Sequence, residues 1–175
     1  MGFQNHLRYG EQARVIRLIP GLQNAEFLQF GQIHRNTYIC SPRVLQATMQ
    51  MRDRANIFFA GQITGVEGYV ESVAMGWLAG VNAARLASGE QLIQAPQSSA
   101  IGALARYVSQ TETKNFQPVN ITFALLPALV EPEHRRIRKK RERRQLQIEL
   151  ALKEWDEWIR QELNNVATAQ GLSTS

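Results

Sequence analysis

Hydrophobic residues recur at helical spacing in four parts of this 175-residue chain. Pro20-Gly21 and Ser88-Gly89 follow the first two parts, and such residues commonly end helices. In the last part, apolar positions continue as far as Leu163. The pattern therefore predicts four helices, over residues 11–19, 67–87, 101–108 and a long stretch beyond residue 131.

Three shorter apolar runs are typical of extended segments. Phe27–Phe30 and Ile33–Ile39 flank Gly31, and Ile57–Ala60 is compact enough for a buried strand. Three glycines, Gly61, Gly65 and Gly68, then lie between this run and the helix predicted from Glu67. The order strand, glycine turn, helix predicts an α/β fold, followed by a mostly helical C-terminal region.

The glycine cluster is the first candidate for chemistry. Glycine weakens regular elements, so a cluster at a strand-to-helix junction indicates that backbone must approach something closely. The start of a helix also presents unpaired N–H groups that favour an anion or a partly negative oxygen, such as a phosphate or a flavin edge. The spacing is neither GxGxxG nor a Walker A loop and includes no lysine. A tight turn that only permits close helix packing fits the pattern equally well.

Positive charge is concentrated in one segment. Residues 135–144, RRIRKKRERR, hold eight of the 20 basic and one of the 15 acidic residues, which leaves 12 basic and 14 acidic residues elsewhere. Such a dense cationic stretch is typical of a surface that binds a polyanion, although a solvated helix end is the alternative. The single cysteine, Cys40, forms no intramolecular disulfide and fits a reducing compartment. The sequence has no membrane-length apolar span and no metal-ligand spacing.

Several long strings resemble the TrmFO family, which comprises folate- and FAD-dependent tRNA (uracil-5-)-methyltransferases related to GidA. The string FFAGQITGVEGYVES, from Phe58 to Ser72, is similar to the family's C-terminal flavin-contacting segment. GFQNHLRYGEQARVIRLIPGLQNAEF, GQIHRNTYI and KNFQPVNITFALLP also resemble the family, in the expected order. The similarity extends from the beginning of the chain to about residue 130, and the basic helix is family-like only in character.

The resemblance implies roles for individual residues. FAD would be bound by the glycine junction, folate by the segment around His34, and tRNA by the basic helix. His34 could equally be a hydrogen-bonded strand residue, and its neighbours could be ordinary surface groups. The implied sets are Gly61, Gln62, Ile63, Thr64, Gly65, Glu67 and Gly68 for FAD; His34, Arg35 and Asn36 for folate; and Arg135, Arg136, Arg138, Lys139, Lys140, Arg141, Arg143, Arg144 and Lys114 for tRNA.

The resemblance also implies that this chain is only the C-terminal part of such an enzyme. The family's dinucleotide-binding segment has no counterpart here, and its nucleophilic cysteine lies upstream, so we expect no catalytic residue in this chain. We expect Cys40 to be a buried, inert thiol. Residues 1–90 would complete the FAD-binding domain and the folate pocket, residues 91–167 would form the helical tRNA-facing region, and residues 168–175 would be a frayed tail.

The implied activity is C5-methylation of the T-loop uridine of tRNA in the cytoplasm. Methylenetetrahydrofolate would donate the carbon, and FAD recharged by NAD(P)H would supply the reducing equivalents. The enzymatic alternative is a GidA-like modification of the wobble uridine. A non-catalytic RNA-binding module, which uses the glycine turn only for packing, is the alternative from another class. No membrane and no metal are expected as partners.

Overall fold

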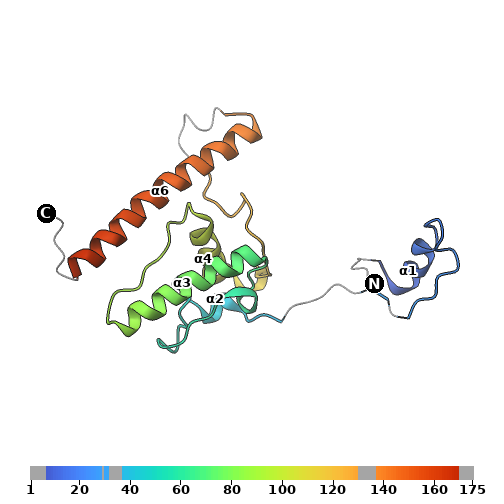
Figure 1. Cartoon of the computed structure of the whole chain (residues 1–175), viewed down its shortest axis with the longest axis horizontal. Helices are drawn as coiled ribbons and strands as arrows, with labels where there is room; N and C mark the ends of the chain where they lie inside the picture. The colour runs from blue at the N-terminus through green and yellow to red at the C-terminus, as the bar shows by residue number, and fades with distance from the viewer. Residues whose placement is uncertain (1–6, 29, 32–36, 130–136, 170–175) are drawn as a thin grey trace. The chain divides into compact units, whose positions relative to one another are not determined.

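The computed structural model describes residues 7–28, 30–31, 37–129 and 137–169, with side chains described as far as residue 162. The chain divides into two compact units, residues 1–36 and residues 37–175 (Figure 1). We call these unit 1 and unit 2.

Unit 1 contains helix α1, Tyr9–Ile16. The helix buries Gln12, whose amide oxygen accepts a hydrogen bond from the Gly31 N–H at 2.8 Å. The Gln12 amide nitrogen donates to the Gly31 carbonyl at 2.9 Å. These two hydrogen bonds hold α1 against the segment around Gly31. The helix predicted over residues 11–19 is therefore confirmed in position, although it begins earlier and ends at Ile16.

Unit 2 is built from helices joined by irregular segments. The predicted helices over residues 67–87 and 101–108 are confirmed, and the long C-terminal helix begins only at Lys140. The described helices of the unit are α2 Ser41–Val44, the 3₁₀ turn η1 Gly61–Thr64, α3 Tyr69–Ala87, α4 Ala100–Gln110, the 3₁₀ turn η2 Thr113–Asn115, and α6 Lys140–Ala169.

Extended backbone occurs in unit 2 only as isolated pairings among the described residues. The run Ile57–Ala60, expected to be a buried strand, is half-buried and contributes one antiparallel bridge, between Phe58 and Gln50. A strand needs a longer ladder than this, because a lone bridge satisfies few backbone groups. The segments expected over Phe27–Phe30 and Ile33–Ile39 fall partly outside the described residues.

The core of unit 2 lies where α3 and α4 pack together (Figure 1). Met75 and Leu78 of α3 and Leu104 and Val108 of α4 are almost fully buried there. The apolar spacing of both helices explains this, because residues three and four apart share one helix face.

A polar side chain, Asn82 of α3, is also fully buried in this unit. Asn82 accepts a hydrogen bond from the Ile93 N–H at 2.7 Å and donates to the carbonyls of Ile93 and Thr48 at 2.9 and 3.1 Å. A buried amide is costly unless it is paired, so these three bonds both satisfy Asn82 and fix the loop after α3.

Helix α6 is attached to the unit through aromatic and ionic contacts. Trp155 and Trp158 lie 6.1 and 6.5 Å from Trp77 of α3, measured between ring centroids. Arg85 of α3 forms an ion pair with Glu162 at 3.4 Å. The apolar half of α6 thus packs, while its cationic beginning is exposed.

Candidate functional site

The candidate cofactor site is the turn between residue 60 and α3. Gly61, Gly65 and Gly68 all have positive φ, at 72°, 82° and 102°. Side chains with a Cβ rarely adopt this conformation, so the backbone path itself requires glycine at these positions. The three glycines recognised in the sequence therefore form a tight turn that leads into α3.

The first half of this turn is fastened to the segment before α2. The Ile39 N–H donates to the Ile63 carbonyl at 2.9 Å, and the Ser41 hydroxyl donates to the Thr64 carbonyl at 2.8 Å. Thr64 is fully buried, and its hydroxyl donates to the Gly61 carbonyl at 2.7 Å. The Thr64 side chain thus holds the turn together and faces the protein interior.

The second half of the turn is held by the segment after α4. Val66 forms a parallel bridge with Val119, through bonds from the Glu67 N–H to the Val119 carbonyl and from the Val119 N–H to the Gly65 carbonyl. A Cβ added at Gly65 would lie 2.6 Å from the ring carbon Cζ of Phe116. Close packing inside the protein is therefore one reason for glycine here.

Helix α3 begins at the surface. No described side chain hydrogen-bonds to its first turn as a cap, and Tyr69 and Val70 are 95% and 79% exposed. The first N–H groups of a helix have no acceptor within the helix itself. A ligand oxygen could therefore accept from the amides of Tyr69 and Val70 at the positive end of the helix dipole.

Glu71 modifies the electrostatics of this helix start. Its carboxylate lies so close to Gly68 that a Cβ there would be 2.0 Å from Oε2, and Oε1 accepts from the Ile121 N–H at 3.4 Å. A carboxylate at this position already complements the helix dipole and would repel a phosphate group. The geometry favours a weakly charged carbonyl oxygen over a phosphate as the guest.

Glu71 was not among the residues singled out from the sequence, and Phe116 was considered only for a stacking contact with tRNA, not for a place beside the glycine turn. Glu71 occupies the third helical position, where capping-box sequences carry Glu or Gln, so its role near Gly68 had a recognisable signal. Phe116 is remote from the turn along the chain, beyond both α3 and α4, and no local pattern could connect it to Gly65.

The predicted FAD-binding residues all lie in or beside this turn. Gln62 and Ile63 are exposed, Gly61, Glu67 and Gly68 are half-buried, and Thr64 and Gly65 are buried. The predicted folate residues, His34, Arg35 and Asn36, lie outside the described residues.

The predicted tRNA-binding residues are largely exposed. Arg135 and Arg136 lie outside the described residues, and Arg138 and Lys139 precede α6. Lys139 pairs with Glu142 at 3.1 Å, and the Arg144 guanidinium lies 4.8 Å from the centre of the Phe123 ring. Lys114, remote in sequence, pairs with Glu112 at 3.2 Å. Among the described residues of this segment, Lys139 is the cation with an ion pair, and Arg138, Lys140, Arg141, Arg143 and Arg144 have none.

Cys40 is exposed, so the expectation that it is a buried thiol was wrong. It is the residue before α2, and only its neighbours Ile39 and Ser41 are fixed by hydrogen bonds to the turn. The backbone around Cys40 is therefore anchored while its side chain faces solvent.

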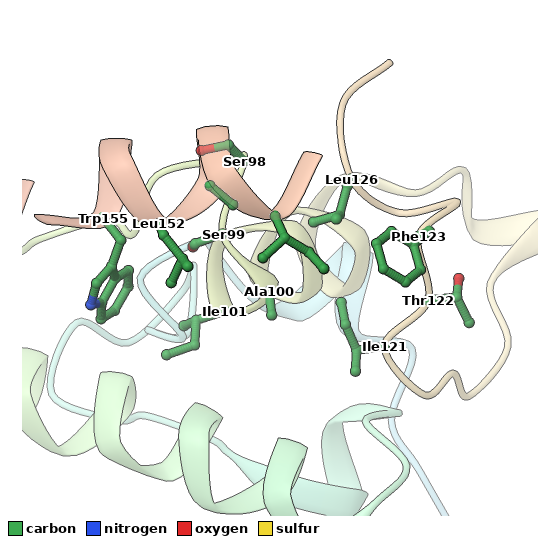
Figure 2. A pocket seen from close by; sticks show the side chains of 12 residues that line it. Ser98, Ser99, Ala100, Ile101, Ile121, Thr122, Phe123, Leu126, Leu152 and Trp155 are labelled. Carbon is green, nitrogen blue, oxygen red and sulfur yellow. The ribbon is translucent and has the colours of Figure 1, made fainter. Parts of the chain in front are cut away.

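A separate apolar cavity of about 440 Å³ lies between α6, the start of α4 and the segment 121–126 (Figure 2). Leu152 and Trp155 extend into it from α6, Ile101 from α4, and Ile121 and Phe123 from the connecting segment. None of the predicted FAD, folate or tRNA residues lines it.

Within the described part of the chain, no helix is long and apolar enough to cross a membrane. The same residues contain no group of three or more His, Cys, Asp or Glu side chains arranged to hold a metal ion.

Comparison with known proteins identifies the class to which this glycine turn and helix belong. The sequence model of the family described as "Glucose inhibited division protein A" matches residues 1–91, which include the whole turn and α3. The chain belongs to this GidA family.

More specific similarity extends through most of the chain. Relatives from Koribacter versatilis and Solibacter usitatus, both named methylenetetrahydrofolate–tRNA-(uracil-5-)-methyltransferase TrmFO, are each 55% identical over 159 residues, covering 91% and 90% of this chain. A relative of the same name from Lactobacillus acidophilus is 55% identical over 143 residues, or 82% of the chain. The chain spans about a third of the length of these relatives, 36%, 36% and 32% respectively.

Replacing Gly65 by alanine tests the turn. We expect Gly65→Ala to lower the free energy of unfolding by about 2–4 kcal/mol, because it adds a left-handed conformational penalty to a steric clash with Phe116. Urea unfolding followed by circular dichroism measures the change.

Gly80→Ala is the matched control, since a Cβ at Gly80 meets nothing within 4 Å. This substitution in the middle of α3 should raise stability by about 0.5–1 kcal/mol. Equal effects of the two substitutions would contradict the account of the turn.

Proposed function

We propose that this chain supplies part of a folate-dependent tRNA (uracil-5-)-methyltransferase that forms 5-methyluridine in the T-loop. The observation that carries the proposal is the 55% identity, over 159 residues, to relatives named for this reaction. The identity extends well beyond residues 1–91, the part matched by the broader family. It therefore favours this reaction over a GidA-like wobble-uridine modification.

We propose FAD as the cofactor at the glycine turn. Support comes from the first turn of α3, which has no side-chain cap and whose residues Tyr69 and Val70 are exposed, so that its amides could donate to a carbonyl oxygen of the flavin ring. Gln62 and Ile63 would lie along the same edge of the ring, with Gly61, Thr64, Gly65, Glu67 and Gly68 shaping the backbone beneath it. Glu71 discourages a phosphate at this position, so the ring is a better guest than the pyrophosphate.

Bound FAD, recharged by NAD(P)H, would supply reducing equivalents for the methyl group. The chain's own residues would position the ring and exclude water from one side of it. His34, with Arg35 and Asn36, is proposed to bind methylenetetrahydrofolate. The imidazole offers a flat face on which the pterin ring can stack, and the cationic and amide side chains can bind the carboxylates of the folate's glutamate part. The nucleophilic cysteine would come from sequence that the relatives carry outside the matched region.

We propose the segment 135–144, together with Lys114, as a tRNA-binding surface. The described cations from Arg138 to Arg144 are exposed and accompanied by one acidic residue, Glu142. Such a surface would bind phosphates with little dependence on base sequence, and the target uridine would be selected by tRNA shape. A cytoplasmic location follows from the proposed tRNA substrate.

The proposed organisation assigns residues 1–90 to the end of an α/β FAD-binding domain with a strand–glycine turn–helix unit. Residues 91–167 would form the tRNA-facing helical region, and residues 168–175 a frayed tail.

A chimeric enzyme tests the proposed activity. The matched region of the Koribacter versatilis relative would be replaced by this chain, and tRNA methylation would be measured with methylenetetrahydrofolate and NAD(P)H. We expect 5-methyluridine in the T-loop and bound flavin. A folded chimera that modified only the wobble uridine would instead support the GidA-like alternative, and one that bound tRNA without any modification would support the RNA-binding module.

Salt dependence tests the tRNA surface. We expect Lys140→Gln/Arg141→Gln to weaken tRNA binding and to reduce the slope of log K against log[salt] by about 1.5–2, because two fewer counterions are released. Filter binding of the full chain at several salt concentrations measures the slope.

Lys153→Gln/Arg160→Gln is the matched control, because it removes the same charge from exposed positions further along α6. We expect a change of less than half that size. If both pairs reduced the slope equally, binding would depend on net charge, and the local surface would be rejected.

A further inference from the structure

A second hollow, smaller than the apolar cavity, lies along the C-terminal half of α4. Its volume is about 250 Å³, and no residue of the glycine turn lines it. Its polar lining includes Arg106 and Gln110, which lie one turn apart on α4, and Thr111, the residue after the helix. We call this space the Arg106 hollow. Its apolar lining comes from Ala103, Ala124 and Leu125.

Arg106 is a half-buried cation without a partner in the described part of the chain. The other half-buried arginine described in unit 2 is Arg85, which pairs with Glu90 at 3.7 Å and with Glu162 at 3.4 Å. The Arg106 side chain has no hydrogen bond or ion pair with any described residue. Withdrawing a charge from water costs free energy unless an opposite charge or hydrogen-bond acceptors replace the water. Arg106 therefore indicates an anionic guest in the hollow.

The charges around the hollow favour such a guest. No carboxylate lines it, and Glu112, the nearest acidic residue along the chain, pairs with Lys114 at 3.2 Å. The last carbonyls of α4 place a partial negative charge near Arg106, which helps to keep the guanidinium charged. All five N–H groups of that guanidinium still lack an acceptor among the described residues. A phosphate can accept two of them in parallel.

The hollow adjoins the proposed tRNA-binding surface. Ala124 and Leu125 line the hollow, and the preceding residue, Phe123, lies 4.8 Å from the Arg144 guanidinium, measured to the ring centre. The segment 123–125 therefore joins the Arg106 hollow to the basic start of α6. A protein carboxylate paired with Arg106 would leave much of the hollow empty. A nucleic-acid backbone offers the phosphate and, next to it, a ribose that can lie against the apolar lining.

We propose that the Arg106 hollow binds a backbone phosphate of tRNA, with the adjoining ribose against its apolar lining. The Gln110 amide and the Thr111 hydroxyl would supply further donors. This contact is additional to the segment 135–144 and Lys114. Two phosphate sites on either side of the segment 123–125 would fix the direction of the RNA backbone, which a single cluster of charges does not. The inference rests on the proposed tRNA binding.

Filter binding of tRNA to the full chain at several salt concentrations tests the proposal. We expect Arg106→Gln to raise Kd about three- to tenfold and to reduce the slope of log K against log[salt] by about 0.7–0.9, because one phosphate contact is lost. Arg160→Gln is the matched control, since it removes the same charge from an exposed position on α6 that has no ion pair among the described residues. We expect this control to leave Kd within about twofold.

Arg106→Lys separates a shaped site from net charge. Lysine keeps the positive charge, so the salt slope should stay within about 0.3 of the wild-type value. An ammonium cannot make the paired N–H bonds of a guanidinium, so Kd should still rise about two- to fivefold. Arg106→Gln should leave the melting temperature of the free chain unchanged or raise it, because the half-buried charge has no described partner to lose. Circular dichroism follows the melting.

Three results would overturn the proposal. The first is unchanged binding by Arg106→Gln when Lys140→Gln/Arg141→Gln weakens it, which would assign Arg106 to a carboxylate elsewhere in the polypeptide. The second is net charge alone, shown by equal effects of Arg106→Gln and Arg160→Gln or by wild-type affinity of Arg106→Lys. The third is a clear fall in the melting temperature of Arg106→Gln, which would show that Arg106 has a structural partner.

These results are distinguishable from failure of the proposed function. In the first, the tRNA surface at α6 stands and the hollow alone is rejected. If the unaltered chain bound no tRNA, the tRNA surface and the hollow would be rejected together.

Discussion

The left-handed backbone of the glycine turn is the constraint on which the rest of unit 2 depends. Gly61, Gly65 and Gly68 have positive φ angles along the turn that leads from residue 60 through η1 into α3. The turn brings Gly65 against the Cζ end of the Phe116 ring and pairs Val66 with Val119, so that segments far apart in the sequence become neighbours. With the turn fixed in this way, α3 can bury its apolar face against α4 while its first turn stays at the surface.

The two interpretations of the glycine cluster, packing and ligand binding, describe different residues of the same turn. Gly65 is required by packing, because Phe116 occupies the space of its Cβ, and Thr64 ties the turn to Gly61. The amides after Gly68 have no side-chain cap among the described residues. For any ligand at this helix start, the Glu71 carboxylate would disfavour full negative charge and tolerate a neutral oxygen. A turn that is held by packing at Gly65 and presents uncapped amides after Gly68 is suited to positioning a planar ring.

The sequence predicted the helices better than the extended segments. Apolar spacing identified α3 and α4 because that spacing is a local property that packing reinforces. The compact run Ile57–Ala60 has the composition of a strand, but no neighbouring segment pairs with it beyond one bridge among the described residues. Exposure of Cys40 and the contact between Gly65 and Phe116 depend on long-range placement, which a single sequence does not encode in any local pattern. The glycine turn could be located in advance and Glu71 had a local signal at the third helical position, whereas the dependence of the turn on Phe116 had none.

Hydrogen exchange at the first turn of α3 tests the central claim most directly, namely that its free amides bind the flavin ring. The sample is the chimeric relative that carries this chain, compared with and without bound FAD by mass spectrometry of peptides covering residues 66–73. The account predicts that FAD slows exchange there by about tenfold or more, because the Tyr69 and Val70 amides gain an acceptor. Unchanged exchange in this peptide, with protection by FAD elsewhere in the protein, would contradict it.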